Sequence, residues 1–153
     1  MSRKLKATAM VRTELKSLYE GYLEDAKRVE RERKPGEGLF GIGKTPADDP
    51  CHDRFAREFE IAVSQLCDDG LCSTDMLDQL LFIYKAPLEN REPASAYWML
   101  LAVHGMTLPM LEKLDKEDAR ELSRWYKGKY PRRERFPAQK LVIESLRRIE
   151  KKN

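Results

Sequence analysis

Apolar residues recur along this chain at intervals of three and four positions, which is the spacing of one face of an α-helix. The first stripe predicts a helix over residues 4–33 and consists of Val11, Leu15, Leu18, Tyr22, Ala26 and Val29. At about 1.5 Å per residue, such a helix is more than about 40 Å long. A compact domain of this size does not need that length, so we expect the helix to bend or its ends to project.

A second helix is predicted by its capping residues as well as by its periodicity. Asp49 is a suitable N-cap, and Pro50 suits the first helical position. The apolar stripe continues through Phe55, Phe59, Val63 and Leu66, and the Asp-Asp-Gly sequence of residues 68–70 ends it. The start of this helix is therefore clearly marked in the sequence.

A third helix is predicted to begin at Ser73 or Thr74, either of which is a suitable N-cap. Its buried positions are expected to be Met76, Leu77, Leu80, Leu81 and Tyr84. Proline disfavours helical geometry in the residue before it. We therefore expect this helix to finish before Pro87.

Residues 93–104 are apolar on nearly all sides of a helix, and such a helix belongs in the centre of a fold. Three further helices are expected, with Thr107 and Asp115 as N-caps of the first two and Pro137 at the start of the last. The last two are expected to bury Ala119, Leu122, Trp125, Tyr126, Leu141, Val142, Leu146 and Ile149. No segment alternates as a strand does. We predict an all-α fold, a compact irregular bundle of six to seven helices around residues 93–104.

Composition is consistent with one domain over residues 1–153, with 41% apolar and 36% charged residues. Three cysteines, an odd number, do not form a disulfide framework, which favours a reducing compartment. The longest apolar run, residues 96–103, is much shorter than the roughly 20 residues that span a bilayer. We expect a cytoplasmic protein with no membrane partner.

The net charge of +3 hides an uneven distribution. Residues 124–153 contain 11 Lys and Arg against three Asp and Glu, a net of +8, and residues 1–34 have a net of +4. The intervening residues 35–123 have a net of −9. Like charges gathered in one place repel one another unless a partner opposes them, so this asymmetry indicates an interaction surface.

The basic residues of the C-terminal part are interleaved with aromatic residues. Over residues 124–136 the cations are Arg124, Lys127, Lys129, Arg132, Arg133 and Arg135, and the aromatic residues are Trp125, Tyr126, Tyr130 and Phe136. Cations bind phosphates and aromatic rings stack on bases. Another interpretation is structural: Trp125 and Tyr126 fit a core stripe, Phe136 staples the last helix, and basic residues near a helix C-terminus favour its dipole.

We therefore predict a small non-enzymatic binding or accessory protein whose face over residues 124–152 engages an acidic partner, either nucleic acid or protein. Arg147 and Arg148 of the last helix extend this face. In the nucleic-acid version the arginines at 132, 133 and 135 hold phosphates, and Tyr130 or Phe136 stacks on a base. Self-association through the long first helix, which would give a homo-oligomer, is an alternative function.

A nucleotide-binding or hydrolytic function is another alternative, because residues 38–45 match the phosphate-binding pattern G-x4-G-K-[ST] through Gly38, Gly43, Lys44 and Thr45. The pattern requires a strand before the loop and a helix beginning at the lysine. Here a charged helical stretch precedes it, and prolines and aspartates follow it. We therefore expect residues 34–50 to be a long loop without a nucleotide site, and its Leu39, Phe40 and Ile42 either to plug the core or to form a docking tip.

The sequence also contains Cys51, His52, Cys67 and Cys72, which are residue types that bind zinc. Cys51 and Cys67 would lie about 24 Å apart along one helix, too far to share an ion, so no metal or other cofactor is predicted. At the start of a helix, Cys51 is expected to have a lowered pKa. His104 is expected to be a hydrogen-bonded core residue, and no catalytic constellation is identified.

Overall fold

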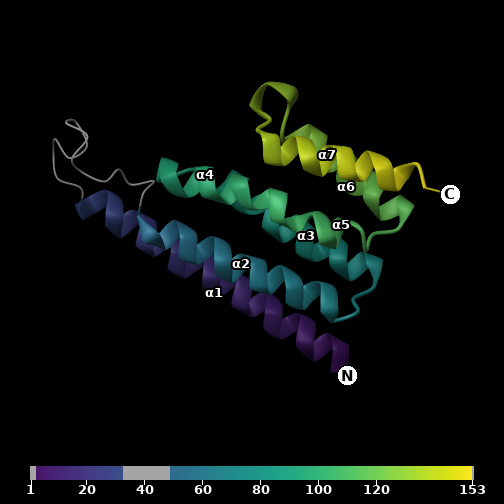
Figure 1. Ribbon diagram of the computed structural model, residues 1–153, viewed down its shortest axis with the longest axis horizontal. Helices are drawn as coiled ribbons and strands as arrows, with labels where there is room; N and C mark the ends of the chain where they lie inside the picture. The colour runs from purple at the N-terminus through teal and green to yellow at the C-terminus, as the bar shows by residue number, and fades with distance from the viewer. Residues whose placement is uncertain (1–2, 33–48, 153) are drawn as a thin grey trace.

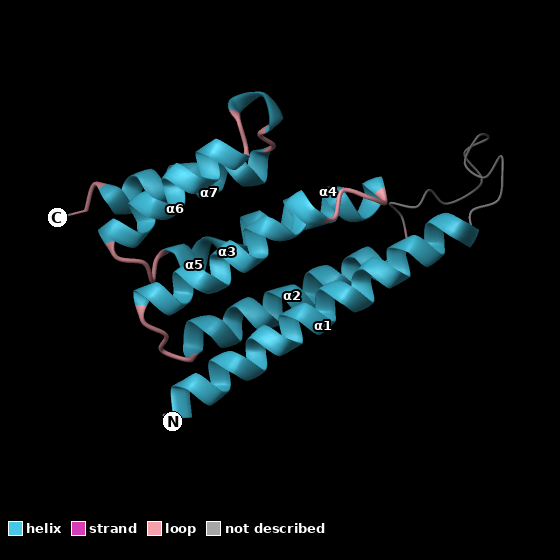
Figure 2. Ribbon diagram, turned by 180° about the vertical axis from the view of Figure 1, so that it is seen from behind, coloured by secondary structure: helices cyan, strands magenta, loops and turns pink. Residues whose placement is uncertain are grey.

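The computed structural model describes residues 3–32 and 49–152, and the regular structure in these ranges is helical throughout (Figures 1 and 2). The α-helices are α1 (Arg3–Glu32), α2 (Pro50–Asp68), α3 (Ser73–Glu89), α4 (Ala94–Ala102), α5 (Leu108–Leu111), α6 (Lys116–Lys129) and α7 (Pro137–Glu150). Two 3-10 helices, η2 (Val103–Thr107) and η3 (Arg132–Glu134), connect them. The all-α prediction is confirmed. The nucleotide-binding pattern of residues 38–45 lies outside the described residues.

The helices form three layers, which Figure 1 shows one above the other. The long helices α1 and α2 pack against each other in the first layer, and α3, α4 and α5 form the middle one. The α6–α7 hairpin covers the other side of the middle layer, with α6 on α3 and α7 on η2 and α5. The core is continuous through all three layers because the middle helices bury side chains on both sides. The prediction that residues near 93–104 lie in the centre is therefore confirmed.

The starts of α2 and α6 are found where the local sequence predicts them. Asp49 is the N-cap of α2, its carboxylate accepts a hydrogen bond of 2.9 Å from the Cys51 N–H, and Pro50 is the first helical residue. Asp115 caps α6 in the same way, accepting from the Asp118 N–H at 2.9 Å. Gly70, with φ 67°, makes the turn that follows α2. Each of these interactions joins residues no more than three positions apart.

The boundaries of α3 differ from the prediction at both ends. Neither Ser73 nor Thr74 is the N-cap; Cys72 occupies that position and has no capping side-chain bond. The Ser73 hydroxyl instead contacts the start of α6, an interaction between distant segments that the sequence does not reveal. At the other end α3 continues through a buried Pro87 to Glu89, so the predicted stop was wrong. Pro87 is buried inside the helix, and tertiary packing of this kind can override local helix propensity.

The central apolar segment is not one helix. It is α4, then η2, then the single turn α5, and Thr107 does not cap α5 with its side chain. The Thr107 hydroxyl donates to the His104 carbonyl oxygen at 2.7 Å and lies 2.5 Å from the Tyr84 hydroxyl. Among the described residues one stretch, Ala94–Leu111, has the length and apolar composition of a membrane span, and half of it is buried inside the protein. This stretch contains the helix that crosses the middle of the core.

One predicted core position in the last layer was wrong, and a second is only partly buried against the core. Leu141 of α7 is 46% exposed, while Gln139, Val142, Ile143, Leu146 and Ile149 are buried. Val142, Leu146 and Ile149 are therefore buried as predicted, and Gln139 and Ile143 complete the stripe that packs against α6 and η2. Trp125 of α6 is only partly buried, although Leu122 and Tyr126 beside it are fully buried as predicted.

Candidate binding surface

The predicted basic segment extends from the C-terminal half of α6 through η3 to the first residue before α7. The connector between the two helices stands at one end of the hairpin (Figure 1), and its last residue, Phe136, lines a pocket together with residues of α4. Two hydrogen bonds hold it in place: the Arg135 Nε–H donates to the Tyr130 carbonyl oxygen at 3.1 Å, and the Phe136 N–H donates to Gln139 Oε1 at 2.7 Å. The cations on η3 are therefore presented by an ordered turn.

Tyr130 is not available to stack on a base, so this part of the prediction was wrong. Its side chain is 1% exposed, and its hydroxyl donates to the Tyr84 carbonyl oxygen at 2.6 Å. The ring lies edge-on to His104, with 5.5 Å between ring centroids. Tyr126 is buried beside it, with its hydroxyl 2.7 Å from His104 Nδ1. Burial raises the pKa of both tyrosines, so both hydroxyls stay protonated. These rings belong to the core.

The cations of the segment divide into paired and unpaired ones. Five are exposed and have no carboxylate partner in the part of the chain that the structure describes: Arg124, Lys127, Lys129, Arg132 and Arg133. Arg135 is partly buried and is used by the connector itself. On α7, Arg148 pairs with Glu112, whose pKa this hydrogen bond lowers, and Arg147 is exposed. The unpaired cations retain their full attraction for an external anion.

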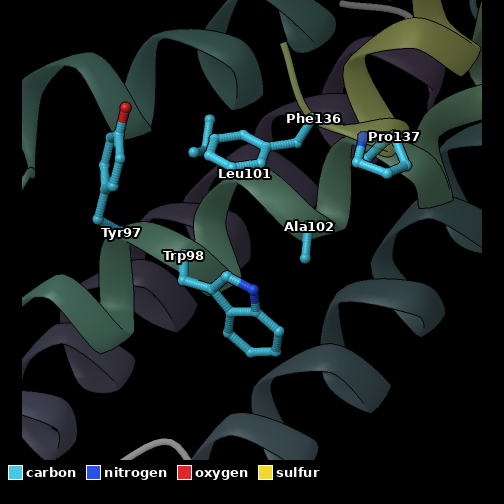
Figure 3. A pocket seen from close by; sticks show the side chains of 7 residues that line it. Tyr97, Trp98, Leu101, Ala102, Phe136 and Pro137 are labelled. Carbon is cyan, nitrogen blue, oxygen red and sulfur yellow. The ribbon is translucent and has the colours of Figure 1, made fainter. Parts of the chain in front are cut away.

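An apolar pocket of about 330 Å³ opens between α4 and the start of α7 (Figure 3). In the chain, Arg132 and Arg133 lie four and three positions before its residue Phe136. Its lining comes from α4 and from the start of α7: Tyr97, Trp98, Leu101, Ala102, Phe136, Pro137 and Ala138. Trp98 is 54% exposed and Phe136 is 50% exposed, although both rings are large and apolar. Figure 3 shows the indole of Trp98 and the ring of Phe136 projecting into this region from the two different segments. The Arg91 guanidinium adds a cation, 5.7 Å from the centroid of the Tyr97 ring.

The α4 side of this pocket was missed by sequence reasoning, which placed Trp98 and Tyr97 in the core with the rest of the segment. The segment is apolar on every side, so its periodicity does not show which side the other helices leave uncovered. Which side it leaves open depends on where α7 begins. Phe136 was predicted as a binding residue, and its exposed position is compatible with that role.

Three other residues with reactive or titratable side chains, Cys51, His52 and His104, are buried. Cys51 is buried, and burial raises the pKa of its thiol to about 12, so the expected lowering by the helix start was wrong. His52 is buried beside Tyr22, with 2.6 Å between its Nδ1 and the tyrosine hydroxyl. His104 is buried as predicted, and desolvation lowers its pKa to about 3. Across the described ranges no group of three or more His, Cys, Asp or Glu side chains is arranged to hold a metal ion.

Comparisons with protein-family models, with curated proteins and with solved structures found no match for this chain. The surface formed by α4, the connector and α7 is the candidate site for function. We refer to the pocket residues named above, together with Arg91 and with Arg132 and Arg133 of the adjoining connector, as the basic–apolar face.

Proposed function

We propose that this chain is a non-enzymatic binding protein whose basic–apolar face holds an acidic segment of another protein. The observation that supports the proposal is the position of two half-exposed aromatic rings, Trp98 and Phe136, around an open apolar pocket. The unpaired Arg132 and Arg133 precede Phe136 by only four and three residues. Exposed apolar patches on monomeric proteins commonly mark interaction sites. Buried aromatic anchors surrounded by a charged rim are the usual anatomy of a protein interface.

The chemistry of the pocket favours a protein over a nucleic acid. Bases need hydrogen-bond partners on their edges or a series of free ring faces on which to stack. The pocket lining is aliphatic and aromatic, and two of the four aromatic residues in the basic segment, Tyr126 and Tyr130, are buried. Moving an apolar side chain from water into such a pocket costs less free energy than moving a base, whose polar edges would find no hydrogen-bond partners there. The nearby cations then attract carboxylates and exclude basic partners.

Site-specific photocrosslinking in the native cell tests this function. Trp98 is replaced by the photoreactive residue p-benzoylphenylalanine, and the control is the same replacement at Ile61, which is 59% exposed on α2 away from the pocket. We expect protein adducts at position 98 that are absent at position 61 and are lost when Arg132→Glu and Arg133→Glu are added. Adducts that disappear after nuclease treatment, or equal adducts at both positions, contradict the proposal.

A further inference from the structure

We infer that the basic–apolar face recognises a short acidic segment carrying one or two bulky apolar anchor residues, such as Phe or Leu, within a few positions of its carboxylates. This inference rests on the proposed function and specifies the chemistry of the partner. Three properties of the face support it: the size of the pocket, the absence of charged groups among the residues that line it, and the short stretch of chain between the cations on η3 and the pocket residue Phe136.

The size of the pocket limits what it can hold. A volume of about 330 Å³ lies at the lower end of the range for small-molecule sites, which is about 300–1,000 Å³. The residues that line it contribute no charged side chain and only the polar atoms of Tyr97 and Trp98. A cofactor with phosphate or carboxylate groups would find no charged partner within the pocket. One or two apolar side chains match both its volume and its chemistry.

The distance between the pocket and the cations sets the spacing of the partner's residues. Arg132 and Arg133 precede the pocket residue Phe136 by only four and three positions. Even an extended connector of that length spans no more than about 14 Å. An extended peptide rises about 3.3 Å per residue, so a carboxylate within about four residues of the anchor reaches these arginines. A helical segment reaches the same distance over about nine residues.

The face is already assembled, so binding does not require it to be rebuilt. The Arg135 side chain donates a hydrogen bond to the Tyr130 carbonyl oxygen, and the Tyr130 hydroxyl donates one to the carbonyl oxygen of the buried Tyr84. The Gln139 side chain holds the Phe136 N–H at the start of α7. Preorganisation of this kind lowers the ordering cost that a weak peptide interaction must overcome. Carboxylates of the partner would be attracted to Arg132 and Arg133, and this attraction would weaken as the salt concentration rises.

The test uses Trp98 as its own reporter. The chain contains two tryptophans, and Trp125→Phe leaves Trp98 as the single one. Three labelled peptides of twelve residues serve as probes: one with a central Phe and Leu among aspartates and glutamates, one with both anchors replaced by Ala, and one with the acids replaced by Gln. We expect the first to shift Trp98 emission to shorter wavelength. Replacing both anchors should weaken binding by at least about 10- to 100-fold, which is the loss expected when a single large apolar side chain is no longer buried.

Variants of the protein locate the site. Phe136→Ala in the single-tryptophan protein should weaken binding of the first peptide by at least about tenfold. Arg132→Glu with Arg133→Glu should also weaken its binding and should remove most of the dependence of binding on salt. Ile61→Ala is the matched control, because Ile61 is an equally exposed apolar residue on α2. Circular dichroism confirms that each variant is folded before binding is compared.

The outcomes separate this inference from the proposed function. If the anchor-free acidic peptide binds as tightly as the anchored one, the inference is overturned and the acidic protein partner stands. If no peptide binds but protein adducts form at position 98, the partner's chemistry has been misidentified. A shift of Trp98 emission with anionic lipid vesicles or nucleic acid in place of the peptides overturns both. Concentration-dependent association of the protein that Trp98→Ala abolishes assigns the pocket to a second copy and also overturns both.

Discussion

The imidazole Nδ1 of His104 lies 2.7 Å from the hydroxyl oxygen of Tyr126, and neither side chain is exposed to solvent. The other ring nitrogen of His104 is buried and has no hydrogen-bond partner among the described residues. A proton added to this ring would place a positive charge in a core of tyrosine rings. Desolvation therefore lowers the pKa of His104 to about 3.

This pKa predicts a loss of stability on mild acidification. Between about pH 6.5 and pH 3 the unfolded chain binds a proton at His104 and the folded chain does not. The contribution of neutral His104 to the free energy of unfolding is therefore fully present above about pH 6.5. It falls as the pH decreases, by up to about 1.4 kcal/mol per pH unit from this residue. Urea unfolding of the protein and of His104→Gln at pH 7, 6 and 5 measures how steeply the free energy of unfolding of each protein falls with decreasing pH. Parallel slopes for the two proteins would show that His104 titrates normally.

Substitutions of Tyr130 and Phe136, the two aromatic residues at the ends of the connector, should affect stability and binding differently. Tyr130→Phe removes a buried donor to the Tyr84 carbonyl, so we expect a loss of about 1–3 kcal/mol in the free energy of unfolding. Phe136→Ala should change stability much less, because half of that side chain is already exposed, and should impair binding at the pocket. Chemical denaturation of both variants checks this. A larger destabilisation from Phe136→Ala would place that ring in the core.

Ser73 should matter for stability more than its neighbour Thr74. The Ser73 hydroxyl donates to the Asp118 carboxylate at 2.5 Å and accepts from the Asp115 N–H at 2.9 Å, which ties the start of α3 to the start of α6. Ser73→Ala removes both bonds, and we expect it to cost about 1–2 kcal/mol. Thr74→Ala is the matched control, since Thr74 is exposed, and thermal unfolding compares the two. If Thr74→Ala is the more destabilising, the capping role that sequence suggests for Thr74 would be correct.

The three cysteines should react with thiol reagents in the order of their exposure. Cys72 is exposed, Cys67 is partly buried and Cys51 is buried. The thiolate is the reactive form, and burial raises the pKa of Cys51 to about 12 and also raises that of Cys67. At pH 8 we expect native protein to be labelled first at Cys72, and Cys51 to be labelled only on the timescale of unfolding. Mass spectrometry of the labelled peptides reads this out, and early labelling of Cys51 would contradict its enclosure.

Parts of the candidate site were predictable and parts were not. Arg132, Arg133 and Phe136 were identified from sequence because cations and aromatic residues are interleaved there, and the structure leaves these side chains exposed. The same pattern also suggested Tyr130, which is buried. Sequence spacing does not distinguish them, because the difference arises from Tyr84 and His104, which lie on other elements. The partner that this face binds stays a prediction.

The sequence by itself determined the helical class, the long first helix and the starts of α2 and α6. Those features depend on periodicity and on the caps Asp49 and Asp115, whose interactions reach only a few positions along the chain. Only the tertiary structure decided that Trp98 faces solvent, that Ser73 joins α6 and that α3 passes through Pro87. Burial depends on which distant helix covers a side chain, and packing energy can override local propensity. The pocket exists because the start of α7 comes to rest beside α4, a relationship between segments more than 30 residues apart.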